Sequence, residues 1–172
     1  MLITPHRNIK GFTLIEVLIA LFVLAIGLLG MATLMMNSMQ SSQGASQRSA
    51  ATVAAYDFAE RLRANRTQAA VANSNYRGNP ADAALPECFT NLANTAGCSN
   101  ADTVALDRAQ WWANLQANIP GAVAAVQQVD VNTFCLVIFW QEPGVANTVS
   151  VPGNPCGVAP NGRAHYSMQV TL

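Results

Sequence analysis

The sequence has few charged side chains. They make up 10% of the 172 residues, against roughly 25% in a typical soluble domain, whereas hydrophobic residues make up 51%. This balance excludes intrinsic disorder, which requires low hydrophobicity and high charge. The nine basic and nine acidic residues cancel to a formal net charge of zero. The chain therefore lacks the basic excess of a typical nucleic-acid-binding protein, and its apolar excess indicates a membrane segment.

Groups that carry enzyme chemistry are also scarce. The two histidines are His6 and His165, and the second falls on the polar side of a predicted strand. None of the common nucleophile, zinc-protease or phosphate-binding motifs occurs. The four cysteines show no C-x-x-C spacing and have no histidine pair beside them, which argues against a zinc site. We therefore expect no enzymatic activity, no catalytic residue, no metal and no cofactor.

One long segment has no charge at all. No charged residue occurs from Val17 to Gln47, and the apolar run itself extends from Phe12 to Met36. Its length suits a membrane-spanning helix, which needs about 20 apolar residues. A secretory signal peptide has a shorter apolar region that ends at a small-residue cleavage site, which this run does not provide. A plain single-span anchor is the alternative, but it does not explain Glu16.

Glu16 places a carboxylate near one end of the apolar run. Such a group costs about 2.5–3.5 kcal/mol at the bilayer centre and less near the interface, and it normally has a partner and a function. Arg7 and Lys10 are the nearest cations in the uncut chain. Cleavage before Phe12 would create an α-amino group four residues from Glu16, and that amine could also meet Glu16 of a neighbouring chain. A buried carboxylate is tolerated when paired with a buried ammonium, and not when unpaired.

The stretch Lys-Gly-Phe-Thr-Leu-Ile-Glu-Val, which begins at Lys10, resembles the processing site of type IV prepilins and related pseudopilins. In that family a dedicated peptidase on the cytoplasmic side cuts after the glycine and methylates the new N-terminal residue. The family's glutamate neutralises the N-terminal amine of an adjacent subunit in the filament. The resemblance therefore implies cleavage between Gly11 and Phe12, N-methylation of Phe12, and a role for Glu16 in assembly.

The leader, residues 1–11, sets the expected orientation. Arg7 and Lys10 would hold that end in the cytoplasm by the positive-inside rule, so the C-terminal domain would be periplasmic. Loss of the leader leaves seven basic and nine acidic residues, a formal charge of −2. The resemblance implies a single-pass protein of the inner membrane that later joins a pilus on the cell surface. It also implies, as partners, other major and minor pilins, the prepilin peptidase and the inner-membrane assembly platform.

A single long helix is the main element that the sequence predicts. No proline lies between Pro5 and Pro80, so one helix can run from Phe12 to about Ala70. Many type IV pilins bend this helix at a proline where the present chain has Thr33. Residues 12–36 form its membrane half and residues 37–72 its amphipathic half. Three glycines are either weak points or sites of close helix packing: Gly27, Gly30 and Gly44. The stripe that we expect to be buried comprises Ala51, Ala55, Phe58 and Leu62.

Residues 73–172 predict a small α+β domain. An irregular loop over 73–101 precedes a helix from Ala101 to Ile119, with Asn100 or Asp102 as its N-cap. Strands are expected over 123–131, 134–141 and 164–172, in an antiparallel sheet of three or four strands that covers the stripe. On the short helix, one face is expected to hold Ala105, Ala109, Trp112 and Ile119. A sheet over the second half of one long helix is also the type IV pilin fold, so pattern and resemblance agree.

A looser resemblance narrows the class of subunit. Asp107, Trp111, Leu115 and Pro120, followed by a strand that ends in Trp140, resemble the PilV-type minor pilins. The favoured function is therefore a minor pilin that enters or primes a type IV pilus, in assembly, adhesion or motility. The alternatives are a pseudopilin of a type II secretion system and an uncleaved, membrane-anchored periplasmic binding domain.

All four cysteines lie in the part expected outside the cytoplasm, where an oxidising compartment favours disulfides. Four cysteines allow three connectivities. We favour Cys88–Cys98 and Cys135–Cys156 because each closes a short local loop, which contributes about 3 kcal/mol in the chain-entropy model. The alternative for Cys135 is a free core cysteine.

Four arginines gather near the end of the long helix, and some pilins take part in DNA uptake. They are Arg61, Arg63, Arg66 and Arg77. Asp57 and Glu60, however, are spaced to pair with the first two at i, i+4 and i, i+3. We therefore favour local ion pairs over DNA binding.

Overall fold

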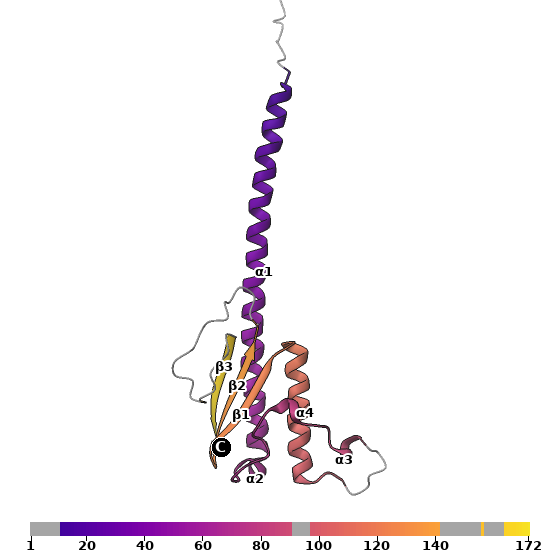
Figure 1. The fold of residues 1–172 in the computed structure, drawn as a ribbon, viewed down its shortest axis with the longest axis vertical. Helices are drawn as coiled ribbons and strands as arrows, with labels where there is room; N and C mark the ends of the chain where they lie inside the picture. The colour runs from indigo at the N-terminus through magenta and orange to yellow at the C-terminus, as the bar shows by residue number, and fades with distance from the viewer. Residues whose placement is uncertain (1–10, 91–96, 142–155, 157–163) are drawn as a thin grey trace, which may run out of the picture. The chain divides into compact units, whose positions relative to one another are not determined.

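The computed structural model describes residues 11–90, 97–141, 156 and 164–172, so residues 1–10 of the leader, with Arg7 and Lys10, lie outside the described residues. The chain divides into two compact units, Met1–Ser41 and Ser42–Leu172. Helix α1, Leu14–Ala64, contributes to both. The other elements, labelled in Figure 1, are α2 (Arg66–Ala69), the 3-10 helix η1 (Pro80–Asp82), α3 (Glu87–Thr90), α4 (Asn100–Asn118), β1 (Val123–Asp130), β2 (Thr133–Trp140) and β3 (Ala164–Thr171).

The first unit contains the N-terminal part of α1, and we call residues 12–41 the stem. Its large apolar side chains, from Phe12 to Met39, are 49–84% exposed. Within the described part of the chain, α1 is the one helix long and apolar enough to cross a membrane. The Thr33 hydroxyl donates to the Leu29 carbonyl at 3.0 Å, so this polar group is satisfied inside the helix. A surface this apolar needs lipid or protein to cover it.

The second half of α1 buries the stripe that its spacing predicts. Ala51, Ala55, Phe58 and Leu62 are each 0% exposed. The helix ends at Ala64 and not near Ala70, because Asn65 leaves helical geometry with φ −114° and ψ 49°. Asparagine favours such breaks since its side chain competes for backbone hydrogen bonds. The following turn is therefore a separate short helix, α2.

Three antiparallel strands in the order β1-β2-β3 pack over this stripe. Each begins and ends within one residue of its predicted bounds. In the register, Leu136 of β2 lies between Val126 of β1 and Met168 of β3. Strand β2 is buried on both sides, because its opposite face forms a second cluster of Cys135, Val137, Phe139 and Cys156. One long helix under a small antiparallel sheet confirms the predicted α+β architecture.

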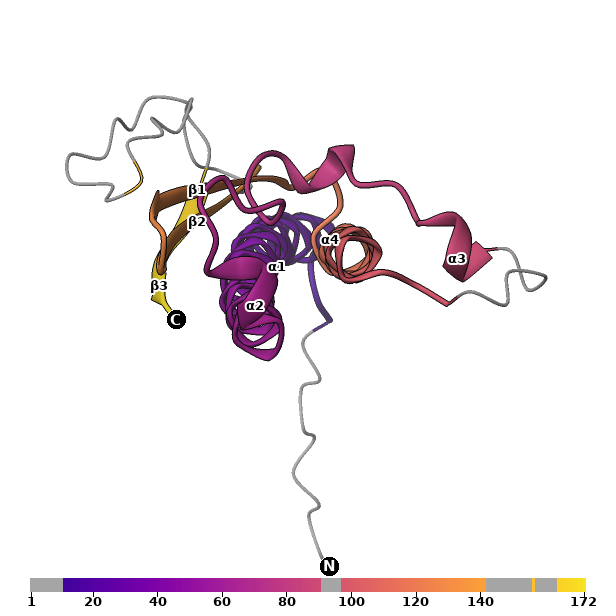
Figure 2. The same cartoon turned by 90° about the horizontal axis from the view of Figure 1, so that it is seen from below.

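Helix α4 lies on a different side of α1 from the sheet, as Figure 2 shows. Its N-cap is Ser99, not Asn100 or Asp102. The Asp102 backbone N–H donates to Ser99 Oγ at 3.2 Å, and the Ser99 N–H donates to the Asp102 carboxylate at 2.8 Å. These two bonds form a capping box. The Ser99 hydroxyl, which donates to the Asp102 carboxylate at 2.6 Å, lowers the pKa of that carboxyl, and the Ser99 backbone N–H lowers it further.

The buried face of α4 also differs from the expected one. Val104, Trp111 and Leu115 are buried, and Ile119 of the expected face is buried too, whereas Trp112 is only partly buried. Trp111 turns inward because its indole Nε1–H donates to the Ala54 carbonyl of α1 at 2.7 Å. This partner comes from another helix, so the spacing along α4 could not reveal it.

Candidate functional site

The motif singled out in the sequence lies at the beginning of α1. Gly11 and Phe12 precede the helix and are exposed, and Phe12 has 84% of its surface accessible. The Thr13 carbonyl accepts hydrogen bonds from the N–H groups of Glu16, at 3.1 Å, and Val17, at 3.3 Å. The Gly11–Phe12 peptide bond is therefore outside the helical hydrogen-bond ladder, and a peptidase could reach it without unwinding a turn.

Glu16 lies in the first turn of α1 and is exposed. A carboxylate there is favoured by the positive end of the helix dipole. The same end would carry the ammonium group of Phe12 after cleavage, four residues away along the chain. The structure thus keeps Gly11, Phe12 and Glu16 close together at the start of α1 and leaves each of them accessible.

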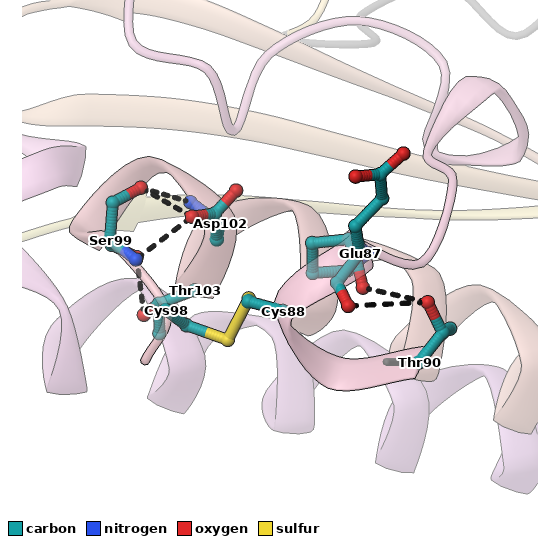
Figure 3. The surroundings of a disulfide bond; sticks show 8 residues. Glu87, Cys88, Thr90, Cys98, Ser99, Asp102 and Thr103 are labelled. Atoms are coloured by element: carbon teal, nitrogen blue, oxygen red, sulfur yellow. Dashed lines mark hydrogen bonds between the residues drawn. A yellow bond between two sulfur atoms is a disulfide. The ribbon is translucent and has the colours of Figure 1, made fainter. Parts of the chain in front are cut away.

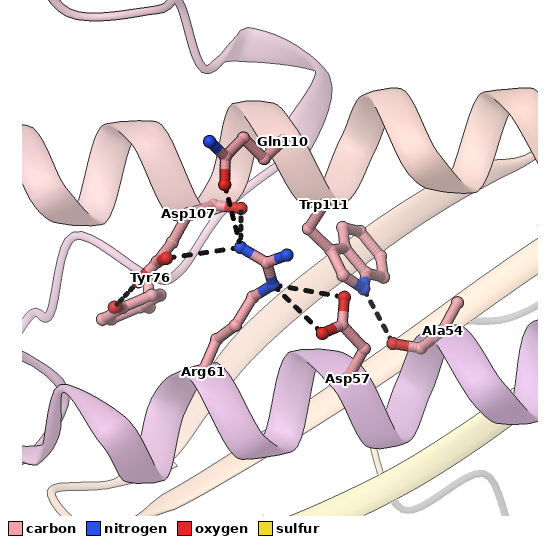
Figure 4. A network of polar contacts seen from close by, with 7 residues as sticks. All are labelled: Ala54, Asp57, Arg61, Tyr76, Asp107, Gln110 and Trp111. Atoms are coloured by element: carbon pink, nitrogen blue, oxygen red, sulfur yellow. Dashed lines mark hydrogen bonds and ion pairs between the residues drawn. The ribbon is translucent and has the colours of Figure 1, made fainter. Parts of the chain in front are cut away.

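A network of polar side chains joins α1 to α4, as Figure 4 shows. Arg61 of α1 contacts Asp57 at 3.2 Å on its own helix and Asp107 of α4 at 3.3 Å. Asp107 in turn accepts a hydrogen bond of 2.6 Å from the Tyr76 hydroxyl. Gln110 adds a contact of 3.5 Å to the same guanidinium. The network around Arg61 therefore holds three segments together, and the sequence had indicated only the pair with Asp57.

Burial and hydrogen bonding affect the titration of this group. Burial raises the pKa of Tyr76, and the hydrogen bond to Asp107 raises it further, since ionisation would place two negative charges side by side. Tyr76 is 0% exposed and lies edge-on to Phe58, with ring centroids 6.2 Å apart. Trp111 meets the same Phe58 ring at 4.9 Å. The network thus lies beside an aromatic cluster that fastens α4 to α1.

The residues that resemble PilV-type pilins have structural positions. Asp107 belongs to the Arg61 network, Trp111 and Leu115 lie in the core, and Trp140 is 2% exposed at the end of β2. Pro120 is exposed just after α4. Of these residues, Asp107, Trp111 and Leu115 therefore place α4 on α1.

Two of the four arginines, Arg61 and Arg63, form the ion pairs that their spacing predicts. Besides the Arg61 contacts, Arg63 pairs with Glu60 at 2.6 Å, and Arg77 donates to the Asn73 side chain at 2.7 Å. The pairing of Arg61 and Arg63 with carboxylates weakens the case for a phosphate-binding surface at these two positions.

Both favoured disulfides are present. Cys88–Cys98 joins α3 to the residue before the Ser99 cap, as Figure 3 shows, with Cα atoms 5.2 Å apart. Cys135–Cys156 joins β2 to Cys156 in the second cluster, with Cα atoms 5.4 Å apart. Cys135 is therefore bonded and not free.

His165 and the other side chains that could bind a metal do not form a common site within the described residues. His165 is half-buried on β3, with its ring centroid 6.4 Å from that of Phe139. Within the described part of the chain, no three side chains of the metal-binding types come together.

Comparison with known families matches two consecutive parts of the chain. A family described as "Prokaryotic N-terminal methylation motif" matches residues 6–32, and one described as "Type IV pilin Tt1218" matches residues 33–109. No curated protein and no solved structure matches the chain. The first match contains Gly11, Phe12 and Glu16, and the second contains the helix under the sheet and the first part of α4. Together with the long N-terminal helix and small antiparallel sheet, these matches support a type IV pilin, a family of structural proteins.

Proposed function

We propose that the chain is a minor subunit of a bacterial type IV pilus. The observation that carries this proposal is the exposed stem, uncharged after Glu16, which begins directly after the Gly11–Phe12 bond. The family matches support a pilin that interacts with other pilins and with the prepilin peptidase. The finer assignment to the PilV type is supported by the positions of Asp107, Trp111 and Leu115, which dock α4 on α1.

Before assembly, the inner membrane would hold the chain through residues 12–36, with residues 73–172 in the periplasm. The peptidase would remove residues 1–11 and methylate the amine of Phe12. The exposed side chains of the stem would be covered first by lipid and then by the stems of other subunits. Lipid is as apolar as the stem, so packing and polar contacts between helices, more than the hydrophobic effect, must drive this exchange.

Glu16 would supply such a polar contact. Its carboxylate is placed at the end of the helix where a neighbour's N-terminal amine also has to be accommodated. A pair between the two charges removes the cost of an isolated ion in an apolar filament core. It also fixes how far one stem is displaced along another, because the pair forms at one register only.

The direct test is intact and N-terminal mass spectrometry of the chain from sheared surface filaments and, separately, from membranes. We expect filaments to contain a chain that begins at N-methylated Phe12. A chain that still begins at Met1 and stays in the membranes of cells with an active peptidase would contradict the proposal and favour the uncleaved anchor. A deletion strain separates the two assembly systems, because loss of pili indicates a pilus subunit and loss of protein secretion a type II pseudopilin.

A further inference from the structure

A groove of about 540 Å³ lies between the second half of α1 and α4, within the second unit. Its α1 wall includes Ala50 and Val53, and its α4 wall includes Asn114 and Asn118. Val53 is 67% exposed, although it lies on the same helix as the fully buried stripe. The groove therefore presents a largely apolar surface, and its lining includes the core residues Trp111 and Leu115.

The charge of the lining limits what can occupy this groove. Of the described lining residues, Asp57 alone carries a charge, and Arg61 pairs with it at 3.2 Å. The other polar residues of the lining, such as Ser46 and Asn114, are neutral. A charged occupant would lose its hydration without gaining a free partner, which is unfavourable. The groove thus selects an uncharged, mainly apolar segment.

The longest uncharged segment of the chain has this chemistry. Residues 17–47 contain no charge, and the large side chains of the stem are exposed. The last part of the stem is rich in methionine, whose flexible side chain fills irregular grooves well. These methionines, each 60–70% exposed, are Met31, Met35, Met36 and Met39.

We propose that the groove between α1 and α4 receives the uncharged stem helix of a neighbouring pilin subunit. This inference rests on the proposed function, because only an assembled filament presents stems to one another. The stem and one wall of the groove both belong to α1, so subunits that pack in parallel meet in this way when displaced along the helix axis. The displacement that brings Met39 of one copy beside Val53 of another is about 14 residues, or roughly 21 Å. A helix seated in an apolar groove is a common mode of recognition.

Site-specific photocrosslinking tests the contact in the full chain within its host. A p-benzoylphenylalanine replaces Val53 in one strain and Tyr56 in a matched control. Tyr56 is similarly exposed, at 57% against 67%, and lies one turn further along α1, but it does not line the groove. We expect irradiated filaments to yield a crosslink from position 53 to a peptide of a pilin stem, at least about fivefold more than from position 56. The difference is expected because such a probe reacts only with groups close to it, and only position 53 lines the groove.

A charge placed in the groove gives a second, independent readout. Asn114→Arg puts a guanidinium on the α4 wall, whereas Ala113→Arg puts the same group on the preceding, exposed position of α4, which does not line the groove. We expect Asn114→Arg to lower the amount of the chain in sheared filaments by at least about fivefold, because the charge would be desolvated against an apolar helix. Ala113→Arg should match the unmodified chain, and both variants should reach normal levels in membranes with both disulfides formed.

The outcomes separate this inference from the proposed function. A chain that never enters filaments overturns the pilus assignment and the groove contact together. A chain that enters filaments but crosslinks equally from positions 53 and 56, or tolerates Asn114→Arg, overturns the groove contact alone. A crosslink to lipid, or to a part of a pilin other than its stem, also overturns the groove contact.

Discussion

The two halves of α1 differ in burial: the apolar side chains of the stem are exposed, whereas one stripe of the second half is fully buried. In the stem, large apolar side chains such as Phe22 are exposed, whereas in the second half Phe58 is fully buried. The stem has no charge after Glu16, whereas the second half carries charged residues beside its apolar stripe. The difference in burial arises because the sheet and α4 cover the second half, and nothing within the described residues covers the stem. One half therefore stabilises the fold of the chain itself, and the other provides surface for contacts outside it.

The largest difference between the halves should appear when a glutamate is removed from each. Glu16→Ala should lower incorporation into sheared filaments by at least about tenfold, since loss of one partner from a buried ion pair costs about 3–5 kcal/mol. Glu60→Ala removes an exposed carboxylate from the second half and should leave incorporation near normal. Quantitative immunoblots of filaments and membranes measure both. Normal incorporation of Glu16→Ala would refute the assembly role of this residue.

A matched pair of phenylalanines tests the same contrast through stability. Phe58→Ala should lower the free energy of unfolding by about 3–5 kcal/mol, because it leaves a cavity beside Trp111 and Tyr76. Phe22→Ala should leave the unfolding of the second unit unchanged, since its side chain is 68% exposed. Denaturant unfolding of the full chain in detergent, followed by tryptophan fluorescence, gives both values. Equal effects would show that the stem is part of the same cooperative core.

Two arginines near the end of α1 sharpen the comparison within its second half. Arg61→Ala should cost about 1–3 kcal/mol, because Asp57 and the partly buried Asp107 lose their common partner. Arg63→Ala should cost at most about 1 kcal/mol, because its pair with Glu60 is exposed. The same unfolding experiment measures the difference. A larger loss for Arg63 would mean that the network does not fasten α4.

The smallest expected effect concerns pH. The pKa of Tyr76 is raised in the folded chain, so the folded state holds this proton more tightly than the unfolded state, where it is released near the usual pKa of about 10. The stabilisation that comes from neutral Tyr76 is therefore complete below about pH 10 and is lost as the pH rises further. Unfolding between pH 8 and 11 should show this decline in the unmodified chain and less of it in Tyr76→Phe. An identical decline in the two proteins would assign it to other groups.

Much of the fold could be predicted because its signals are local. The alternation in residues 164–172 defines β3, and the spacing of Ala51, Ala55 and Phe58 defines the buried stripe of α1. The N-terminal motif is also local, since Gly11, Phe12 and Glu16 lie within six residues of one another. Their roles in processing and assembly stay predictions, to be tested on filaments.

The prediction for the buried face of α4 failed because a contact from a distant segment decided the outcome. The buried face of α4 depends on the bond between Trp111 and the Ala54 carbonyl, which lie far apart in the sequence. The contacts of Asp107 with Arg61 and with Tyr76 also join segments that are distant in the sequence. Periodicity within one helix carries no information about such partners.

The sequence by itself determined that this chain has an uncharged helix with a processing motif at its start, because hydrophobicity and motif spacing are properties of consecutive residues. The tertiary structure alone decided which face of α4 packs on α1, how Arg61 is shared, and that an open groove is left between the two helices. Those features depend on how segments distant in the chain pack together. The native packing leaves few buried polar groups without a hydrogen bond and buries the apolar stripe of α1 in the second unit.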